Sequence, residues 1–194
     1  TFSSTTVSMA DYHVEEYVRE MNLAAVKLAR DLADEYTAKN PDKPRFVAGS
    51  VGPTNKTCSM SPDVNNPAYR ALSYDELAAS YQQQMEAMLE GGVDAILIET
   101  IFDTLNAKAA IFAAEQAMKT IGVEVPVMLS VTVSDIGGRT LSGQTLDAFL
   151  ASVQHANIFS VGLNCSFGAR QLKPFLEQLA ARAPYYISAY PNAG

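Results

Sequence analysis

Apolar residues recur at helical spacing near the start of the chain and form short continuous runs further on. The helical spacing predicts one amphipathic helix over residues 10–38, ended by Asn40 and Pro41. Runs without polar alternation are typical of strands that are covered on both faces. These runs predict strands at R-F-V-A-G-S-V (45–51), V-D-A-I-L-I-E-T (93–100), P-V-M-L-S-V-T-V (126–133), I-F-S-V-G-L-N-C (158–165) and Y-Y-I-S-A-Y (185–190).

A helical pattern precedes each of the later strands. Ser73 and Glu76 have the spacing of a capping box, and Gly91-Gly92 is a typical helix end. Five strands, each preceded by a helix, predict an α/β protein with a parallel sheet. The helices are expected at about residues 74–90, 104–119, 145–155 and 170–181.

A parallel sheet forms either an open doubly wound fold or a closed (β/α)8 barrel, and both bind ligands at the carboxyl ends of the strands. G-S-V-G-P-T lacks the lysine of a phosphate-binding loop, and D-I-G-G-R-T lacks the G-x-G-x-x-G spacing of a dinucleotide site. No strand ends in a lysine that could form a Schiff base. The barrel is therefore favoured, but it is expected to be incomplete, because a whole barrel takes about 250 residues.

Composition and charge exclude several classes of partner. The 194 residues are 48% hydrophobic, enough for a sizeable core, and 14 Lys+Arg against 21 Asp+Glu give a net charge of -7. Without a basic cluster, neither nucleic acid nor an anionic membrane is an expected partner. The sequence also lacks a membrane-length apolar stretch and a signal peptide at its start, so we expect a cytoplasmic protein.

Several polar residues stand where the predicted strands end, and Glu99 and Cys165 carry the most chemistry. A carboxylate at the end of a buried strand needs a partner, so Glu99 is expected to meet an amine, cap the next helix or pair with an arginine. Cys165 can fill a gap in the core, act as a nucleophile next to the helix that begins near Gly168, or bind a metal. His13 and His155 are poorly placed to act as a base, and Cys58 is interpreted as a bystander thiol.

Six segments spread over the whole chain carry family motifs. They are T-F-S-S-T-T-V-S-M-A-D-Y, G-P-T-N-K-T-C-S-M-S-P-D-V, I-L-I-E-T-I-F-D-T-L-N-A-K-A-A, G-R-T-L-S-G-Q-T, V-G-L-N-C-S-F-G-A and Y-P-N-A-G. In this order they resemble the homocysteine-binding domain of cobalamin-dependent methionine synthase. The resemblance implies a (β/α)8 barrel that holds zinc on three cysteine thiolates, where the sulfur of homocysteine is bound as a thiolate and takes the methyl group of methylcobalamin.

The resemblance also implies residue roles and partners. Cys165 corresponds to a zinc ligand, Glu99 to the acid that binds the homocysteine ammonium group, and Asn164 to a substrate-binding residue that helps to position the site. No residue is assigned as a catalytic acid or base. The methylcobalamin is expected on another domain, and the folate-, cobalamin- and reactivation domains of a full-length enzyme are expected partners.

Two motifs of that family are missing from the chain. The G-G-C-C-G segment with the other two zinc ligands and the D-G-A-M-G-T segment of the first strand do not occur. Residues 1–194 are therefore predicted to be a fragment of one barrel domain, with the end of strand 2 and strands 3–7, inactive alone and prone to self-association. Two alternatives stay open: a cobalamin-independent homocysteine S-methyltransferase that uses betaine or S-methylmethionine, and an amino-acid-binding module without catalysis.

Overall fold

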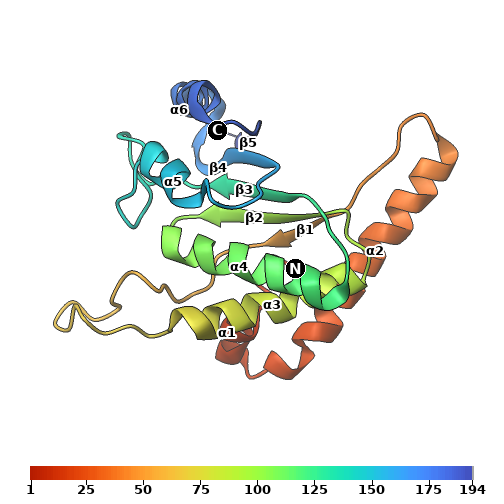
Figure 1. Ribbon diagram of the computed structural model, residues 1–194, viewed down its shortest axis with the longest axis horizontal. Helices are drawn as coiled ribbons and strands as arrows, with labels where there is room; N and C mark the ends of the chain where they lie inside the picture. The colour runs from red at the N-terminus through yellow and green to blue at the C-terminus, as the bar shows by residue number, and fades with distance from the viewer. Residues whose placement is uncertain (194) are drawn as a thin grey trace.

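The computed structural model describes residues 1–193 and shows one parallel sheet with helices packed on it (Figure 1). The helical elements before the sheet are α1 (Thr6–Met9), η1 (Ala10–Tyr12), η2 (Glu15–Tyr17) and α2 (Val18–Lys39). The sheet and its connecting helices are β1 (Ala48–Val51), α3 (Tyr74–Glu90), β2 (Ala95–Ile101), α4 (Thr104–Ile121), β3 (Val127–Val131), α5 (Leu146–Val153), β4 (Ser160–Gly168), α6 (Ala169–Arg182) and β5 (Tyr186–Asn192).

The strands lie in the sheet in the order in which they occur along the chain. Each neighbouring pair is parallel, and a helix lies between every two consecutive strands. A doubly wound sheet would reverse its strand order at a switch point, whereas a barrel keeps sequential order. The predicted α/β fold with five parallel strands is confirmed, and it is consistent with part of a (β/α)8 barrel. The numbers of these strands within a complete barrel stay a prediction.

The predicted single helix over residues 10–38 is wrong at its start. The long helix α2 begins at Val18, and the preceding residues form α1 and two short 3₁₀ turns. His13 has a left-handed backbone with φ of +56° at the end of η1, which interrupts any continuous α-helix there. The 3₁₀ turns keep apolar residues three positions apart, so the sequence pattern continues through the break.

Local signals define the ends of α3 as the sequence predicts. The Ser73 side chain accepts a hydrogen bond from the Glu76 backbone N–H at 3.3 Å, and the Ser73 backbone N–H donates to the Glu76 carboxylate at 2.8 Å. The hydrogen bonds that the Ser73 backbone N–H and the Ser73 hydroxyl donate to the carboxylate hold the pKa of Glu76 below its usual value. At the other end, Gly92 has a φ of +88°, which glycine adopts without steric cost.

The core lies between the sheet and the helices α3 and α4, which run side by side against it (Figure 1). The buried face of α4 is rich in alanine, whose side chain is a single methyl group, so the backbones of α3 and α4 can approach closely. The fully or nearly fully buried residues of this core include Val51, Leu77, Met85, Met88, Ile96, Ile98, Ala109, Ala110, Ala113, Ala114, Leu129, Val131, Val161 and Leu163. The two edges of the sheet differ in how far they are covered. Residues 1–5 cover part of the β1 edge, where the backbone N–H of Gly52, just after β1, donates to the Phe2 carbonyl. The β5 edge is more open, and its Tyr186 is 71% exposed.

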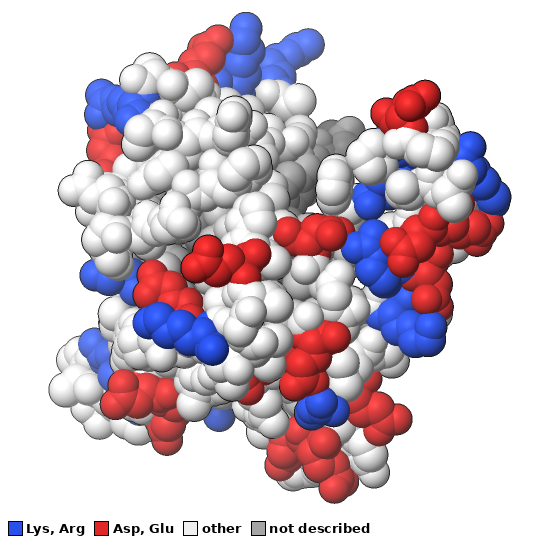
Figure 2. Space-filling view, turned by 45° about the vertical axis from the view of Figure 1, so that its right-hand side comes forward, with Lys and Arg blue, Asp and Glu red and all other residues white. Residues whose placement is uncertain are grey.

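Charges of both signs are mixed on one face of the molecule (Figure 2), and none of the described helices is suited to span a membrane. Figure 2 shows Lys and Arg side chains scattered among Asp and Glu, without a continuous basic area on the face in view. Within residues 1–193, no helix combines the length and the apolar character that are needed to cross a bilayer.

Candidate active site at the carboxyl ends of the strands

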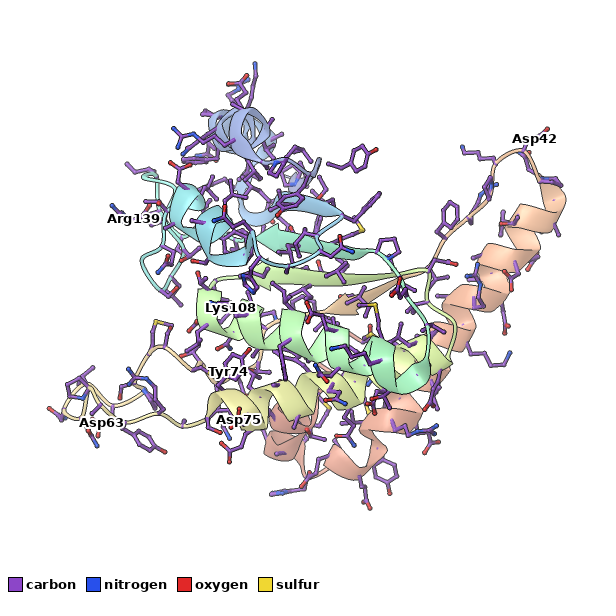
Figure 3. All side chains as sticks on the ribbon, viewed as in Figure 1. Asp42, Asp63, Tyr74, Asp75, Lys108 and Arg139 are labelled. Atoms are coloured by element: carbon purple, nitrogen blue, oxygen red, sulfur yellow. The ribbon has the colours of Figure 1, made fainter. Side chains whose placement is uncertain are left out.

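The carboxyl ends of the strands and the two longest loops lie on the same side of the sheet. In Figure 1 the arrowheads of β2 and β3 point toward the loop 52–72 and the loop 132–145. Figure 3 labels Asp63 and Arg139 on these loops. Parallel α/β folds bind their ligands at this side of the sheet, which makes it the candidate site.

The loop 52–72 is tied to the start of α4 by buried polar side chains. Asp103, only 2% exposed, accepts hydrogen bonds from the backbone N–H groups of Leu105 at 2.9 Å and Ser59 at 3.3 Å, and from the Ser59 hydroxyl. The Asn106 side chain accepts from the Cys58 backbone N–H at 2.9 Å. Asp103 is thus both the N-cap of α4 and the anchor of the loop. Sequence analysis missed this anchor, although an aspartate directly before a predicted helix is a recognisable cap signal.

Glu99 stands near the end of β2 and is held by two hydroxyl groups. The Ser50 hydroxyl donates to its Oε1, and the Tyr190 hydroxyl donates to its Oε2 at 3.1 Å. Asp103, not Glu99, caps the following helix, and none of the salt bridges among residues 1–193 involves Glu99. Two of the three partners considered for this carboxylate are therefore ruled out within the described residues, and an amine from outside them stays a prediction.

Tyr190 on β5 is a site residue that sequence analysis did not single out. Its hydroxyl donates to Glu99, and the pKa of Tyr190 is raised, mainly because its surroundings remove the hydroxyl from water and secondarily by the charge of Glu99. The group therefore stays protonated and acts as a hydrogen-bond donor. Tyr190 lies opposite Asn164 on the neighbouring strand β4, and this strand register is not visible in the sequence.

Asn164 and Cys165 lie beside Glu99 in the same cluster. The Asn164 side chain, 1% exposed, donates to the Cys165 sulfur at 3.1 Å and accepts from the Thr100 backbone N–H, next to Glu99, at 3.1 Å. Cys165 itself is partly exposed, as a group that meets a ligand must be. The structure thus brings Glu99, Asn164 and Cys165 together, and their roles stay predictions.

The other thiol and the imidazoles lie outside this cluster. Cys58, a residue of the loop 52–72, is 7% exposed, and burial raises the pKa of its thiol from 9.0 to about 11, which fits an unreactive bystander. His13 and His155 are both exposed, and His155 follows α5 near the opposite ends of the strands.

The cluster does not complete a metal site with its own residues. Zinc takes at least three protein ligands, usually thiolates, imidazoles or carboxylates. Over residues 1–193, no three His, Cys, Asp or Glu side chains are grouped closely enough to hold an ion. Among the described residues, Cys165 is the one thiol in the cluster with Glu99 and Asn164, because Cys58 lies in the loop 52–72, where its backbone N–H donates to Asn106.

Comparison with known proteins agrees with this architecture. Two crystal structures of the homocysteine methyltransferase MmuM from Escherichia coli, the metallated and the oxidized form, share the fold with a TM-score of 0.79 at 22% identity over the whole chain. The apo form of MmuM gives a TM-score of 0.74 at 23% identity over 93% of the chain. The chain spans less than two thirds of the length of these proteins, 62% to 65%. The sequence model of the family described as homocysteine S-methyltransferase matches residues 1–194, so the chain belongs to the homocysteine S-methyltransferase family.

Proposed function

We propose that this chain is part of one barrel domain that binds homocysteine and transfers a methyl group to its sulfur, which gives methionine. The observation that carries the proposal is the placement of Glu99 and Cys165 in one cluster, in a chain of the homocysteine S-methyltransferase family. Homocysteine carries an ammonium group and a thiol at opposite ends. A carboxylate and a sulfur site on one side of the sheet match these two ends.

In this proposal Glu99 binds the ammonium group of homocysteine. Its oxygens accept hydrogen bonds from Ser50 and Tyr190, which fix the carboxylate without neutralising its charge. The remaining lone pairs can accept from a ligand ammonium, and such a charged hydrogen bond contributes about 1.5 to 3 kcal/mol.

We further propose that Cys165 is one of the thiolate ligands of a zinc ion, as the family resemblance implies. Among the described residues, Cys165 is the only thiol of the cluster, and one ligand is fewer than zinc requires, so the other ligands would have to come from sequence outside these 194 residues. This chain alone is then expected to be inactive.

The methyl donor has two candidates. The six sequence segments resemble the cobalamin-dependent enzyme, which would make methylcobalamin the donor and the folate-, cobalamin- and reactivation domains the partners. Neither the family description nor the names of the solved structures mention cobalamin, and those structures are of a homocysteine methyltransferase. Transfer without cobalamin, from a donor such as S-methylmethionine or betaine, is therefore supported at least as well.

The test is methionine formation by the complete protein that contains this chain. Homocysteine is supplied with methylcobalamin, S-methylmethionine or betaine in separate reactions, and the donor that supports turnover identifies the subclass. Cys165→Ser should abolish bound zinc and methyl transfer together, whereas Cys58→Ser, the matched control at the buried thiol, should keep both. Full zinc occupancy in Cys165→Ser would refute the ligand role, and homocysteine binding without turnover for any donor would leave only the amino-acid-binding module.

A further inference from the structure

Two β-bulges interrupt the sheet at the candidate site. Pairing of β2 with β3 runs to Ile98 and resumes at Ile101, so the bulge contains Glu99 and Thr100. Pairing of β4 with β5 runs to Asn164 and resumes at Gly168, so a second bulge contains residues 165–167. Bulges near active sites redirect side chains, and here they set the directions of Glu99 and Cys165.

Both bulges contain non-glycine residues with left-handed backbones. The φ angles are +57° at Thr100, +58° at Cys165 and +60° at Ser166. A β-branched residue such as threonine is especially unfavourable in this region, because its side chain crowds the backbone. Such conformations persist only where surrounding contacts hold them, and they cluster at functional sites.

The Asn164 side chain provides these contacts for both bulges. It reaches past β3, where its Oδ1 accepts from the Ser130 hydroxyl at 2.6 Å, to the Thr100 backbone N–H at 3.1 Å. Its Nδ2 donates to the Thr100 hydroxyl at 2.9 Å and to the Cys165 sulfur at 3.1 Å. A carboxamide has two donors and two acceptor lone pairs, so all four are used within the protein.

We propose that Asn164 is a positioning residue that locks both bulges and thereby fixes the Glu99 carboxylate relative to the Cys165 thiol. With all four hydrogen bonds committed, its amide has no free capacity to bind substrate directly. The functional meaning of the two fixed groups rests on the proposed function. The lock, meaning the restraint that the hydrogen bonds of Asn164 place on both bulges, is a property of this chain and can be measured without any methyl transfer.

Amide hydrogen exchange of the 194-residue chain tests the lock. In Asn164→Ala, the Thr100 amide should exchange at least tenfold faster, the factor for about one lost hydrogen bond, and the amides of residues 165–168 should follow. Asn164→Asp keeps the acceptor oxygens and loses both donors, so it should protect Thr100 while releasing residues 165–168. The matched control is Asn22→Ala, another fully buried amide, which bonds to the backbone carbonyls of Ser4 and Val18 and should leave both bulges unchanged.

The Thr100→Gly background provides a second, independent test of the lock if Asn164→Ala folds poorly. Glycine adopts the left-handed conformation freely, so the destabilisation caused by Asn164→Ala should be smaller in the Thr100→Gly background. The lock would be overturned if the Thr100 amide in Asn164→Ala exchanged within twofold of its rate in the unsubstituted chain. Losses of stability that are additive in the double variant would overturn it as well.

Kinetics of the complete protein test the positioning role. Asn164→Asp should raise the KM for homocysteine at least fivefold, and Asn22→Ala should not change it. An unchanged KM together with faster exchange at residues 165–168 would overturn the positioning role. If the unsubstituted complete protein transfers no methyl group, the proposed function fails while the exchange result still decides the lock.

Discussion

Replacement of Asp103 by alanine should destabilise the protein by about 3 kcal/mol. Loss of an N-cap costs about 1 kcal/mol, and each of the two hydrogen bonds to Ser59 contributes about 1 kcal/mol more. Asp103→Asn keeps a capping oxygen but places an amide against the Ser59 N–H, so it should lose about 1 to 2 kcal/mol.

Urea unfolding at neutral pH measures these losses from the shift in midpoint at constant slope. The matched control is Ser73→Ala, which removes an exposed N-cap side chain of α3 that bonds only to Glu76 and keeps the backbone next to the loop 52–72; it should cost about 1 kcal/mol. Limited proteolysis should also cut Asp103→Ala faster within that loop, because its anchor is gone. A loss in Asp103→Ala no larger than that in Ser73→Ala would refute the role of Asp103 as an anchor.

Four further predictions concern other parts of the molecule. Burial raises the pKa of Cys58 from 9.0 to about 11, so the contribution of the neutral thiol to the free energy of unfolding is complete below pH 9 and is lost as the pH rises through 11. Relative to Cys58→Ala, the free energy of unfolding should fall by up to about 3 kcal/mol over that range in urea titrations. Glu99→Gln in the complete protein should keep zinc and weaken homocysteine binding by about 1.5 to 3 kcal/mol in calorimetry, and equal affinity would argue against ammonium binding. Gly162→Ala should detach β5 and abolish cooperative unfolding, because the added Cβ would lie 2.1 Å from the Ser188 carbonyl oxygen; a normal unfolding transition would contradict this packing. The exposed edge of β5 should cause self-association at high concentration, which light scattering would exclude if it showed only monomer.

The sheet could be predicted from the sequence because its strands are short apolar runs bounded by turn residues. Capping signals at Ser73 and glycine after α3 located a helix to within a residue. The start of α2 could not be found in this way, because 3₁₀ turns repeat every three residues and imitate the spacing of an α-helix. The left-handed His13 that separates them has no sequence signal of its own, since histidine adopts this conformation only in particular contexts.

The candidate site was predictable only where a residue stands at the end of a strand. Glu99 and Cys165 are found by this rule, because parallel strands bring their carboxyl ends to one side of the sheet. Ser50 and Tyr190 belong to the site through the curvature and register of the sheet, which bring side chains of β1 and β5 to the carboxylate on β2. The bulges around Thr100 and Cys165 were also hidden, since neither contains the glycine that usually marks a left-handed backbone.

The polar groups of the cluster favour a cationic ligand over any other kind. Every hydrogen bond that reaches Glu99 comes from a neutral hydroxyl, and the sulfur of Cys165 receives one from a neutral amide. An arginine at this place would have neutralised the carboxylate and competed with the ammonium group of an amino acid. Because no lysine or arginine among the described residues forms a salt bridge with Glu99, its carboxylate is left to attract a cation from elsewhere. The proposed ammonium binding at Glu99 and the proposed metal binding at Cys165 would therefore depend on one electrostatic condition, and a lysine or arginine introduced into this cluster should weaken both.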